Sequence, residues 1–237
     1  MLVWALAGTA CSAGAMAWAV RGRASRIFGP SVWHGSRDRR SIALTFDDGP
    51  SETTPRLLEL LARHGVRATF FVCGANVARL PDAAREIAAA GHEIGNHSYS
   101  HTRFDFHSRA FIYDELSRAQ EVIGGAAGRV PSLFRSPYGV RWFGLAEVQR
   151  RLKLLGVMWT ALGLDWRLDA GRICSRLERR AAPGSIFCLH DGRDIQVRPD
   201  VRATIDAVGR LIPILQEKGF RFETVSEILC PKQSPTG

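Results

Sequence analysis

After residue 40, short apolar runs alternate with longer segments in which apolar residues recur at helical spacing. The short runs are rich in β-branched and aromatic residues, which is typical of buried strands. Strands that alternate with helices indicate repeated βα units and a parallel sheet. The pattern therefore predicts an α/β fold of seven βα units. The expected strands span residues 42–46, 69–73, 93–96, 133–135, 157–161, 186–189 and 220–223.

The segments between these strands show the apolar spacing of amphipathic helices. Glycine tolerates the left-handed conformation that a helix end commonly requires, so Gly65, Gly91, Gly156 and Gly219 are expected to end four of the helices. No internal linker interrupts the pattern, which predicts one domain over residues 38–230 and a flexible tail over 231–237. The expected helices span residues 55–63, 81–90, 108–123, 145–155, 170–181 and 201–218.

The first 22 residues form an apolar segment, and residues 2–20 contain no charged side chain. At about 1.5 Å per residue a helix of this length crosses a bilayer, although its many alanines and glycines make it only weakly hydrophobic. We therefore expect an apolar N-terminal helix that anchors the protein in a membrane, with a cleaved signal peptide as the alternative. Residues 23–37 are expected to be a basic linker, and their arginines leave the orientation in the membrane open.

Composition limits the partners that the protein can have. Hydrophobic residues make up 46% of the chain and charged residues 23%, which excludes a disordered protein. A net charge of +9 favours anionic surroundings. Most of the arginines are spread along the chain instead of being clustered with aromatic residues, so no nucleic-acid binding is expected. The five cysteines lack the spacing of a disulfide framework or a cysteine zinc site.

Polar side chains follow several of the expected strands at the point where each strand ends. In parallel βα folds the loops at the carboxyl ends of the strands converge, and functional groups collect there. Five strand ends are therefore expected to point polar groups at one rim. These groups are Asp47, Asp48, His97, His101, Arg135, Asp165 and His190.

Two of these strand ends carry the elements of a metal site. Asp47 and Asp48 project in different directions, so one carboxylate can bind a metal while the other takes a proton. A simple turn is the alternative, because Asp-Gly-Pro is a common turn composition. His97 and His101 can reach one ion when the chain between them turns like a helix, or they can be structural histidines. Two histidines with Asp48 form a recurrent ligand set for zinc, iron, cobalt or manganese.

The residues at these strand ends resemble the motifs of the polysaccharide deacetylase family, also called the NodB homology or carbohydrate esterase 4 group. The resemblance covers nearly everything after the N-terminal segment and implies a distorted (β/α)7 barrel. It also implies a hydrolase that removes N-acetyl groups from amino sugars of peptidoglycan, a chitin-like polymer or a related glycan. A monomer, exported or membrane-anchored and facing the cell wall, is expected. Five motifs match in order, at residues 45–50 (TFDDGP), 97–101 (HSYSH), 135–139 (RSPYG), 165–166 (DW) and 188–191 (CLHD).

The resemblance assigns chemical roles to the motif residues. Asp48, His97 and His101 are implied to hold a divalent metal, with Zn²⁺ expected and Co²⁺, Fe²⁺, Mn²⁺ or Ni²⁺ as alternatives. Asp47 is the implied base, which takes a proton from the attacking water. His190 is the implied acid, which protonates the leaving amine.

Other motif residues are implied to support these groups or to bind the substrate. Arg135 would orient Asp47 and keep it ionised, and Asp165 would favour the protonated imidazole of His190. The backbone N–H of Tyr138 is expected to stabilise the oxyanion. The residues implied to bind the substrate are Tyr138, Pro137, Trp166 and Cys188.

Two positions depart from the family pattern. Leu162 stands where another aspartate is frequent, and Cys188 stands where a leucine that lines the acetyl pocket is frequent. Cysteine is smaller than leucine, which leaves the acyl group open. The alternative functions are an acetyl esterase of the acetylxylan type, a hydrolase of non-sugar amides and a catalytically inactive wall-binding protein. An inactive protein should lack a metal ligand or the base, and this sequence has them all.

Overall fold

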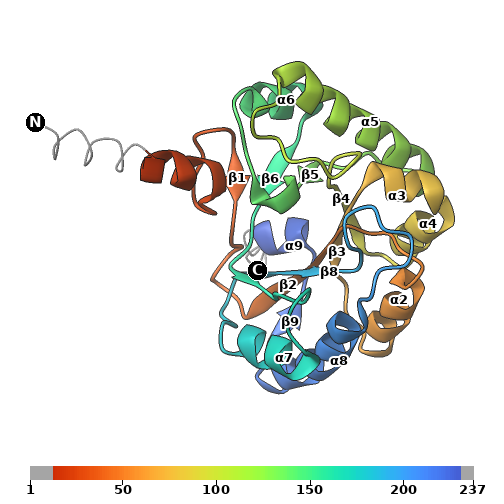
Figure 1. Ribbon diagram of the computed structural model, residues 1–237. Coiled ribbons are helices and arrows are strands. Elements are labelled where there is room, and N and C mark those ends of the chain that lie inside the picture. The colour runs from red at the N-terminus through yellow and green to blue at the C-terminus, as the bar shows by residue number, and fades with distance from the viewer. Residues whose placement is uncertain (1–12, 231–237) are drawn as a thin grey trace, which may run out of the picture.

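Nine short strands of the computed structural model form one sheet, and most of the helices cover its outer face (Figure 1). The structure describes residues 13–230. Within them the strands are β1 (Ser31–Val32), β2 (Ser41–Asp47), β3 (Thr69–Val72), β4 (Glu93–Asn96), β5 (Leu133–Phe134), β6 (Leu155–Val157), β7 (Ala161–Leu162), β8 (Ser185–His190) and β9 (Arg221–Phe222).

Every strand pairing in this sheet is parallel, in the order β1-β6-β5-β4-β3-β2-β8-β7, and β9 pairs with the first residues of β2. The predicted parallel α/β architecture is therefore confirmed. Among the described residues, β1 and β7 are the two ends of the order and do not pair with each other. The sheet is therefore a curled half-barrel, whereas we expected a distorted (β/α)7 barrel.

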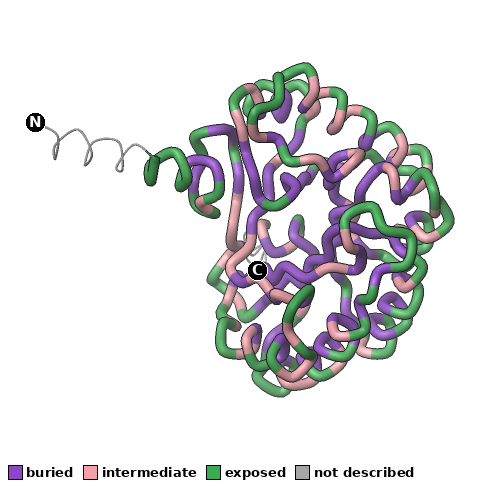
Figure 2. Tube along the Cα trace, in the orientation of Figure 1, coloured by how far each residue is buried: buried purple, intermediate pink, exposed green. Residues whose placement is uncertain are grey.

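Helices surround the sheet, and their outward faces are exposed while most strand residues are buried (Figure 2). One helix differs: α9 lies near the centre of the view in Figure 1, among the strands. The helices are α2 (Thr54–Arg63), α3 (Gly74–Arg79), α4 (Pro81–Ala89), α5 (Arg109–Ala127), α6 (Leu145–Leu152), α7 (Ala170–Glu178), α8 (Arg202–Glu217) and α9 (Val225–Leu229), with a 3₁₀ turn η1 (Pro137–Gly139).

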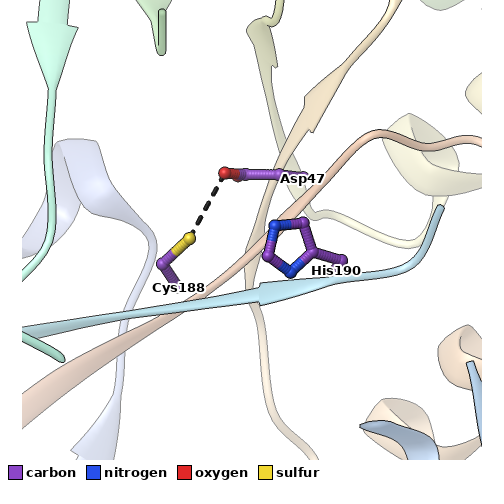
Figure 3. Close-up of side chains that lie close together, drawn as sticks. All are labelled: Asp47, Cys188 and His190. Carbon is purple, nitrogen blue, oxygen red and sulfur yellow. Dashed lines mark hydrogen bonds between the residues drawn. The ribbon is translucent and has the colours of Figure 1, made fainter. Parts of the chain in front are cut away.

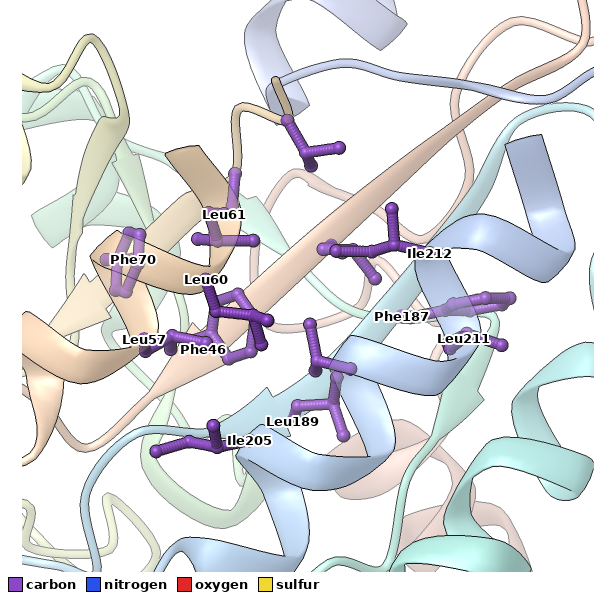
Figure 4. Close-up of a cluster of buried hydrophobic side chains, with 14 of the residues drawn as sticks. Phe46, Leu57, Leu60, Leu61, Phe70, Phe187, Leu189, Ile205, Leu211 and Ile212 are labelled. Atoms are coloured by element: carbon purple, nitrogen blue, oxygen red, sulfur yellow. The ribbon is translucent and has the colours of Figure 1, made fainter. Parts of the chain in front are cut away.

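The central strand β2 is buried along its whole length, and its side chains alternate between two apolar regions. Leu44 and Phe46 belong to the large core between the sheet and helices α2 and α8 (Figure 4). Ala43 faces the interior of the half-barrel, where Val225 and Ile228 of α9 pack against it. The interior is therefore filled, and Asp47, the inward-facing residue that ends the strand, opens onto the rim.

Some expected elements differ from the observed ones. The expected strand at 157–161 is wrong: β6 ends at Val157, β7 begins at Ala161, and the three residues between them leave the sheet. Strand β1 falls within the expected linker 23–37 and pairs with β6, so the sheet includes part of that segment. Helices α3 and α9 were not expected from the sequence.

The expected N-terminal helix lies only partly within the described residues. Residues 13–21 are helical and end beside β1 (Figure 1). The remainder of the predicted anchor, residues 1–12, lies outside the described residues, as does the predicted tail at 231–237. Within residues 13–230, the structure contains no helix with the length and apolar character needed to span a membrane.

Candidate active site

The carboxyl ends of β2 and β8 and the loops that follow β4, β5 and β7 surround a cavity of about 570 Å³. Arg135 and Asp165 are buried against it, at hydrogen-bonding distance from lining residues. Pro137 begins the η1 turn and is not among the described residues that line the cavity. The lining residues expected from the sequence are Asp47, Asp48, His97, His101, Tyr138, Trp166, Cys188 and His190.

Asp48, His97 and His101 converge on one point. Oδ1 of Asp48 lies 3.3 Å from Nε2 of His97 and 3.0 Å from Nε2 of His101. This buried oxygen has no hydrogen-bond partner among the described residues. Burial alone would raise the pKa of Asp48, but the two imidazoles outweigh it and hold that pKa well below its usual range. The three ligand atoms are thus an anionic oxygen and two imidazole nitrogens close enough to bind one cation.

Contacts on the far side of each imidazole leave Nε2 directed at this point. Nδ1 of His97 lies 2.7 Å from the carbonyl oxygen of Arg135, to which it can donate a proton. Nδ1 of His101 lies 2.6 Å from Oδ1 of Asp194. Metal-binding histidines are commonly held in this way, because a partner at one ring nitrogen fixes the tautomer that offers the other to the metal.

The loop from His97 to His101 is not helical, so the turn that we expected there is wrong. Ser98 has φ 63° and His101 has φ 59°, which bring the two imidazoles together from a non-helical loop. Glu115 of α5 holds this loop, because its Oε2 accepts the backbone N–H groups of Tyr99 and Ser100 at 3.1 and 2.8 Å. The sequence predicted that both histidines lie at the site, but not that a residue of α5, Glu115, holds the loop that orients them.

Asp47 is held by a fully buried arginine. Nη1 of Arg135 lies 2.6 Å from Oδ1 of Asp47 and 2.7 Å from Oγ1 of Thr45. Nε and Nη2 of Arg135 donate to the carbonyl oxygens of Val157 and Met158 at 3.1 and 3.3 Å. The guanidinium is therefore fixed from several sides, and it fixes one oxygen of the carboxylate in turn. The predicted contact between Arg135 and Asp47 is present.

His190 and Asp165 form a second pair of charged residues at the cavity. Nδ1 of His190 lies 2.8 Å from Oδ1 of Asp165, while Oδ2 accepts the backbone N–H of His190 at 2.9 Å and the Thr204 hydroxyl at 2.6 Å. Burial would lower the pKa of His190, but the ionised Asp165 outweighs it and raises that pKa to about 9. The imidazole therefore holds a proton at neutral pH.

Aromatic and apolar side chains form the remaining walls. The Trp166 ring meets His190 edge-on at 5.3 Å between centroids, and Tyr138 lies 4.7 Å from His101. Cys188 also lines the cavity and is buried, with its Sγ 3.3 Å from Oδ2 of Asp47. Leu162, where the family pattern often has an aspartate, also lines the cavity. The cavity thus has an apolar side next to its polar groups.

Sequence reasoning missed Asp194, which follows β8 by four residues. Besides contacting His101, its Oδ1 accepts the hydroxyl of Tyr138 at 2.7 Å, and its backbone N–H donates to Oδ2 of Asp48 at 3.0 Å. Arg193 was missed too; its Nη2 donates to the carbonyl oxygen of Asp165 at 3.0 Å. The loop after β8 was the available signal, because such loops carry functional residues in parallel βα folds.

Several residues of the site have a left-handed backbone, which non-glycine residues rarely adopt. They cluster around the two imidazoles, and such strain is commonly retained at functional sites. Asp48 has φ 70°, Tyr138 has φ 56° and Asp194 has φ 49°, in addition to the two residues of the histidine loop. The geometry of the site thus depends on backbone conformations that are intrinsically unfavourable for these residues and that the surrounding structure must stabilise.

Comparison with known proteins agrees with this geometry. Residues 34–157 match the family model described as polysaccharide deacetylase. A peptidoglycan-N-acetylglucosamine deacetylase from Bacillus cereus is 33% identical over 198 residues, covering 82% of this chain and 70% of the relative. A chitooligosaccharide deacetylase from Bradyrhizobium sp. is 35% identical over 198 residues, covering 80% of this chain and 90% of the relative.

Solved structures share the fold over most of the chain. The Bc1960 peptidoglycan N-acetylglucosamine deacetylase matches with a TM-score of 0.78 and 31% identity, covering 83% of this chain and 91% of that one. The BA3943 protein of Bacillus anthracis, a carbohydrate esterase 4 pseudoenzyme, matches with a TM-score of 0.79 and 27% identity, covering 88% and 72%. The same fold thus occurs in a deacetylase and in a pseudoenzyme, so the fold alone does not establish activity.

Proposed function

The chain belongs to the polysaccharide deacetylase family, and we propose that it hydrolyses the N-acetyl groups of amino sugars in a polysaccharide. The observation that carries this proposal is the meeting of Asp48, His97 and His101 beside a second, separately held carboxylate, Asp47. One set of residues can bind a cation while the other carboxylate accepts a proton. An inactive wall-binding protein would not need both.

The implied cofactor is a divalent cation, and the residues fit it. The buried Oδ1 of Asp48 lacks a hydrogen-bond donor among the described residues, and the two imidazoles are held with Nε2 toward it. We propose Zn²⁺, because two imidazoles and a carboxylate are a recurrent zinc set, with Co²⁺, Fe²⁺, Mn²⁺ or Ni²⁺ as alternatives. When bound, such an ion polarises a carbonyl and makes water easier to deprotonate.

Asp47 is the proposed base. Its Oδ1 is held by Arg135, which leaves Oδ2 toward the cavity and the thiol of Cys188. Oδ2 is placed to accept the proton of the water that attacks the amide carbon. Arg135 makes the base more effective by preventing rotation of the carboxylate, so that Oδ2 keeps facing the cavity.

His190 is the proposed acid. Asp165 keeps it protonated, and the ring lies at the cavity wall, so it can give a proton to the amine as the bond to the acetyl carbon breaks. We place the acetyl methyl group against Trp166 and Cys188, beside the base. The backbone N–H of Tyr138 is the proposed donor to the carbonyl oxygen as it gains negative charge.

The test is an assay on purified peptidoglycan and N-acetylglucosamine oligomers, in which acetate and free amine are both measured. We expect the two products in equal amounts. Acetate without amine, released from acetylated xylan, would show an esterase instead.

Substitutions test the residues, each with a matched control. His101→Ala should abolish deacetylation and Asp47→Asn should slow it by orders of magnitude, while Asp82→Asn and His107→Ala, at two exposed residues, should do neither. Full activity in either site variant would refute the assignment.

We also propose that the protein works outside the cytoplasm, on the cell wall, and that residues 2–20 attach it to the membrane. The support is the lack of charge over those residues together with the wall polymers on which the named relatives act. Fractionation of cells that express the full chain tests this: recovery in the soluble cytoplasmic fraction would contradict it.

A further inference from the structure

We propose that Asp47, Cys188 and His190 form a second metal site, which takes a divalent cation with affinity for sulfur, such as zinc, and blocks the reaction when filled. The blocking effect depends on the proposed roles of Asp47 and His190, whereas the site itself does not. It is distinct from the Asp48 site, because the two sites share no ligand.

The strand register brings the three side chains together. Cys188 and His190 are alternate residues of β8 and point into the same side of the sheet. Asp47 is the Cα partner of His190 on the neighbouring strand β2. One ligand atom from each residue lies within 4.8 Å of the others, and Figure 3 shows the thiol pointing at the carboxylate with the imidazole beside them.

Each residue keeps one donor atom for such an ion. Nδ1 of His190 faces Asp165, which leaves Nε2 for a metal, the arrangement in which a carboxylate supports a ligating histidine. Oδ1 of Asp47 is bound to Arg135, which leaves Oδ2. The thiol of Cys188 lies 3.3 Å from that oxygen.

This spacing suits a tetrahedral ion. Zinc binds thiolate sulfur at about 2.3 Å and carboxylate oxygen at about 2.0 Å, which puts two such ligands about 3.5 Å apart in a tetrahedron. The observed separation of 3.3 Å between Sγ and Oδ2 therefore needs little movement. A leucine at position 188 would remove the sulfur and with it the site.

Burial and charge make this site the weaker of the two. Burial raises the pKa of the Cys188 thiol well above its usual range, and the imidazole of His190 holds a proton at neutral pH, so the ion must displace both protons to bind. The guanidinium of Arg135 adjoins the site and repels a cation, while Asp165 behind His190 attracts one. The Asp48 site therefore fills first and the Cys188 site only when metal is in excess.

A titration of the metal-free full-length protein with Co²⁺ tests the proposal. Thiolate bound to Co²⁺ absorbs in the near ultraviolet, and the Asp48 site has no sulfur ligand. We expect two ions per chain at saturation, with this absorption appearing only as the second ion binds. Cys188→Ala should bind one ion and lose the absorption, whereas Cys230→Ser, which removes an exposed thiol, should keep both.

Further variants separate this proposal from the proposed function. His101→Ala should lose the first ion yet keep the thiolate absorption, so failure of one site does not mimic failure of the other. If Cys188→Ala does not fold, Cys188→Ser, which keeps the side-chain shape with oxygen in place of sulfur, takes its place. A thiolate absorption that survives in the Cys188 variant, or a wild-type protein that never shows one, would overturn the proposal.

Discussion

Asp47 and Asp48 are adjacent in the sequence, but their carboxylates point to different partners. Asp47 ends β2 and keeps the strand conformation, so its side chain faces the interior and Arg135. Asp48 has φ 70°, which turns its carboxylate out of the strand toward the two imidazoles. One left-handed residue therefore separates the proposed base from the proposed metal ligand.

Loss of the proposed base should lower the reaction rate even when the proposed metal ligands remain. Asp47→Asn keeps the shape of the side chain but cannot take a proton at Oδ2, so we expect kcat to fall by roughly 10²–10⁴-fold. Metal content and the unfolding transition of the variant are measured alongside. A variant that binds its metal normally and retains kcat would show that another group accepts the proton.

The pH profile tests the acid. The pKa of His190 is raised to about 9 by Asp165, so the protonated ring persists at neutral pH and is lost as the pH rises through about 9. Activity should fall on that alkaline side. The stabilisation that the pair gives the fold is complete below the ordinary histidine pKa of about 6.5 and is also lost through about 9.

The matched change is Asp165→Asn, which removes the carboxylate that raises this pKa. We expect the alkaline limb of the kcat profile to move to lower pH, by an amount that reports the coupling. An unmoved limb would mean that some group other than His190 sets it.

At the residue scale, the sequence predicted which polar residues gather at the cavity, because their motifs are specific. It did not predict Asp194, whose half-exposed side chain reaches both His101 and Tyr138. That contact requires a loop with φ 49° that folds back over the site. Residue types and spacing carry no signal for such a conformation.

At the scale of elements, α9 fills the inside of the half-barrel. Its five residues begin with a capping box, in which Thr224 and Glu227 exchange hydrogen bonds. Val225 and Ile228 are fully buried among inward residues of the strands. A helix this short shows too little periodicity to be predicted, although the sheet needs it to exclude water from below the site.

Shortening a buried side chain of α9 should destabilise the whole domain. Ile228→Ala should lower the free energy of unfolding by about 2–5 kcal/mol, because it leaves a cavity in a packed interior. Ile27→Ala, at a residue that is 61% exposed, should change it by less than about 0.5 kcal/mol. Urea unfolding of the two variants gives the comparison, and equal losses would contradict the packing role of α9.

Helix ends were predicted correctly where a glycine alone determines the end of the helix. Gly65, Gly91 and Gly219 have positive φ, as expected of glycines that end helices. Gly156 instead lies in β6, and Lys153 takes the left-handed position after α6. Glycine tolerates the left-handed conformation, but the packing of neighbouring elements decides which residue adopts it.

The expected strand at 157–161 failed for a reason that periodicity cannot show. Strands β6 and β7 lie toward opposite ends of the sheet, so residues 158–160 cross its open side. The N–H of Met158 donates to Val32 on β1, and that of Thr160 donates to Ile186 on β8. Arg135 binds the carbonyl oxygens of Val157 and Met158. Within the five residues of this expected strand, the chain therefore changes its hydrogen-bonding partner from β1 to β8.

At the scale of the whole molecule, a parallel sheet places all its carboxyl ends on one side. This explains why motifs spread from residue 45 to residue 191 form a single cavity. The sequence predicted this gathering, because it follows from parallel βα units alone. It could not predict that the sheet stays open, since closure depends on the pairing of two-residue strands at its ends.

Metal should stabilise the fold as well as enable the reaction, because its proposed ligands come from the ends of two different strands. Free ion at 100 times its dissociation constant should add about 2.7 kcal/mol to the free energy of unfolding. The unfolding midpoint of wild-type protein should rise accordingly, while that of His101→Ala, which keeps only the weaker Cys188 site, should rise by less. A shift of equal size in both would place the stabilising ion elsewhere.

The most direct test of the account is the rate of acetate release from an N-acetylglucosamine oligomer as metal-free protein is titrated with Zn²⁺. We predict no activity without metal, a linear rise that ends at one ion per chain, and no recovery in His101→Ala. Full activity of the metal-free protein, or equal recovery in His101→Ala, would contradict the claim that Asp48, His97 and His101 hold the ion on which the reaction depends.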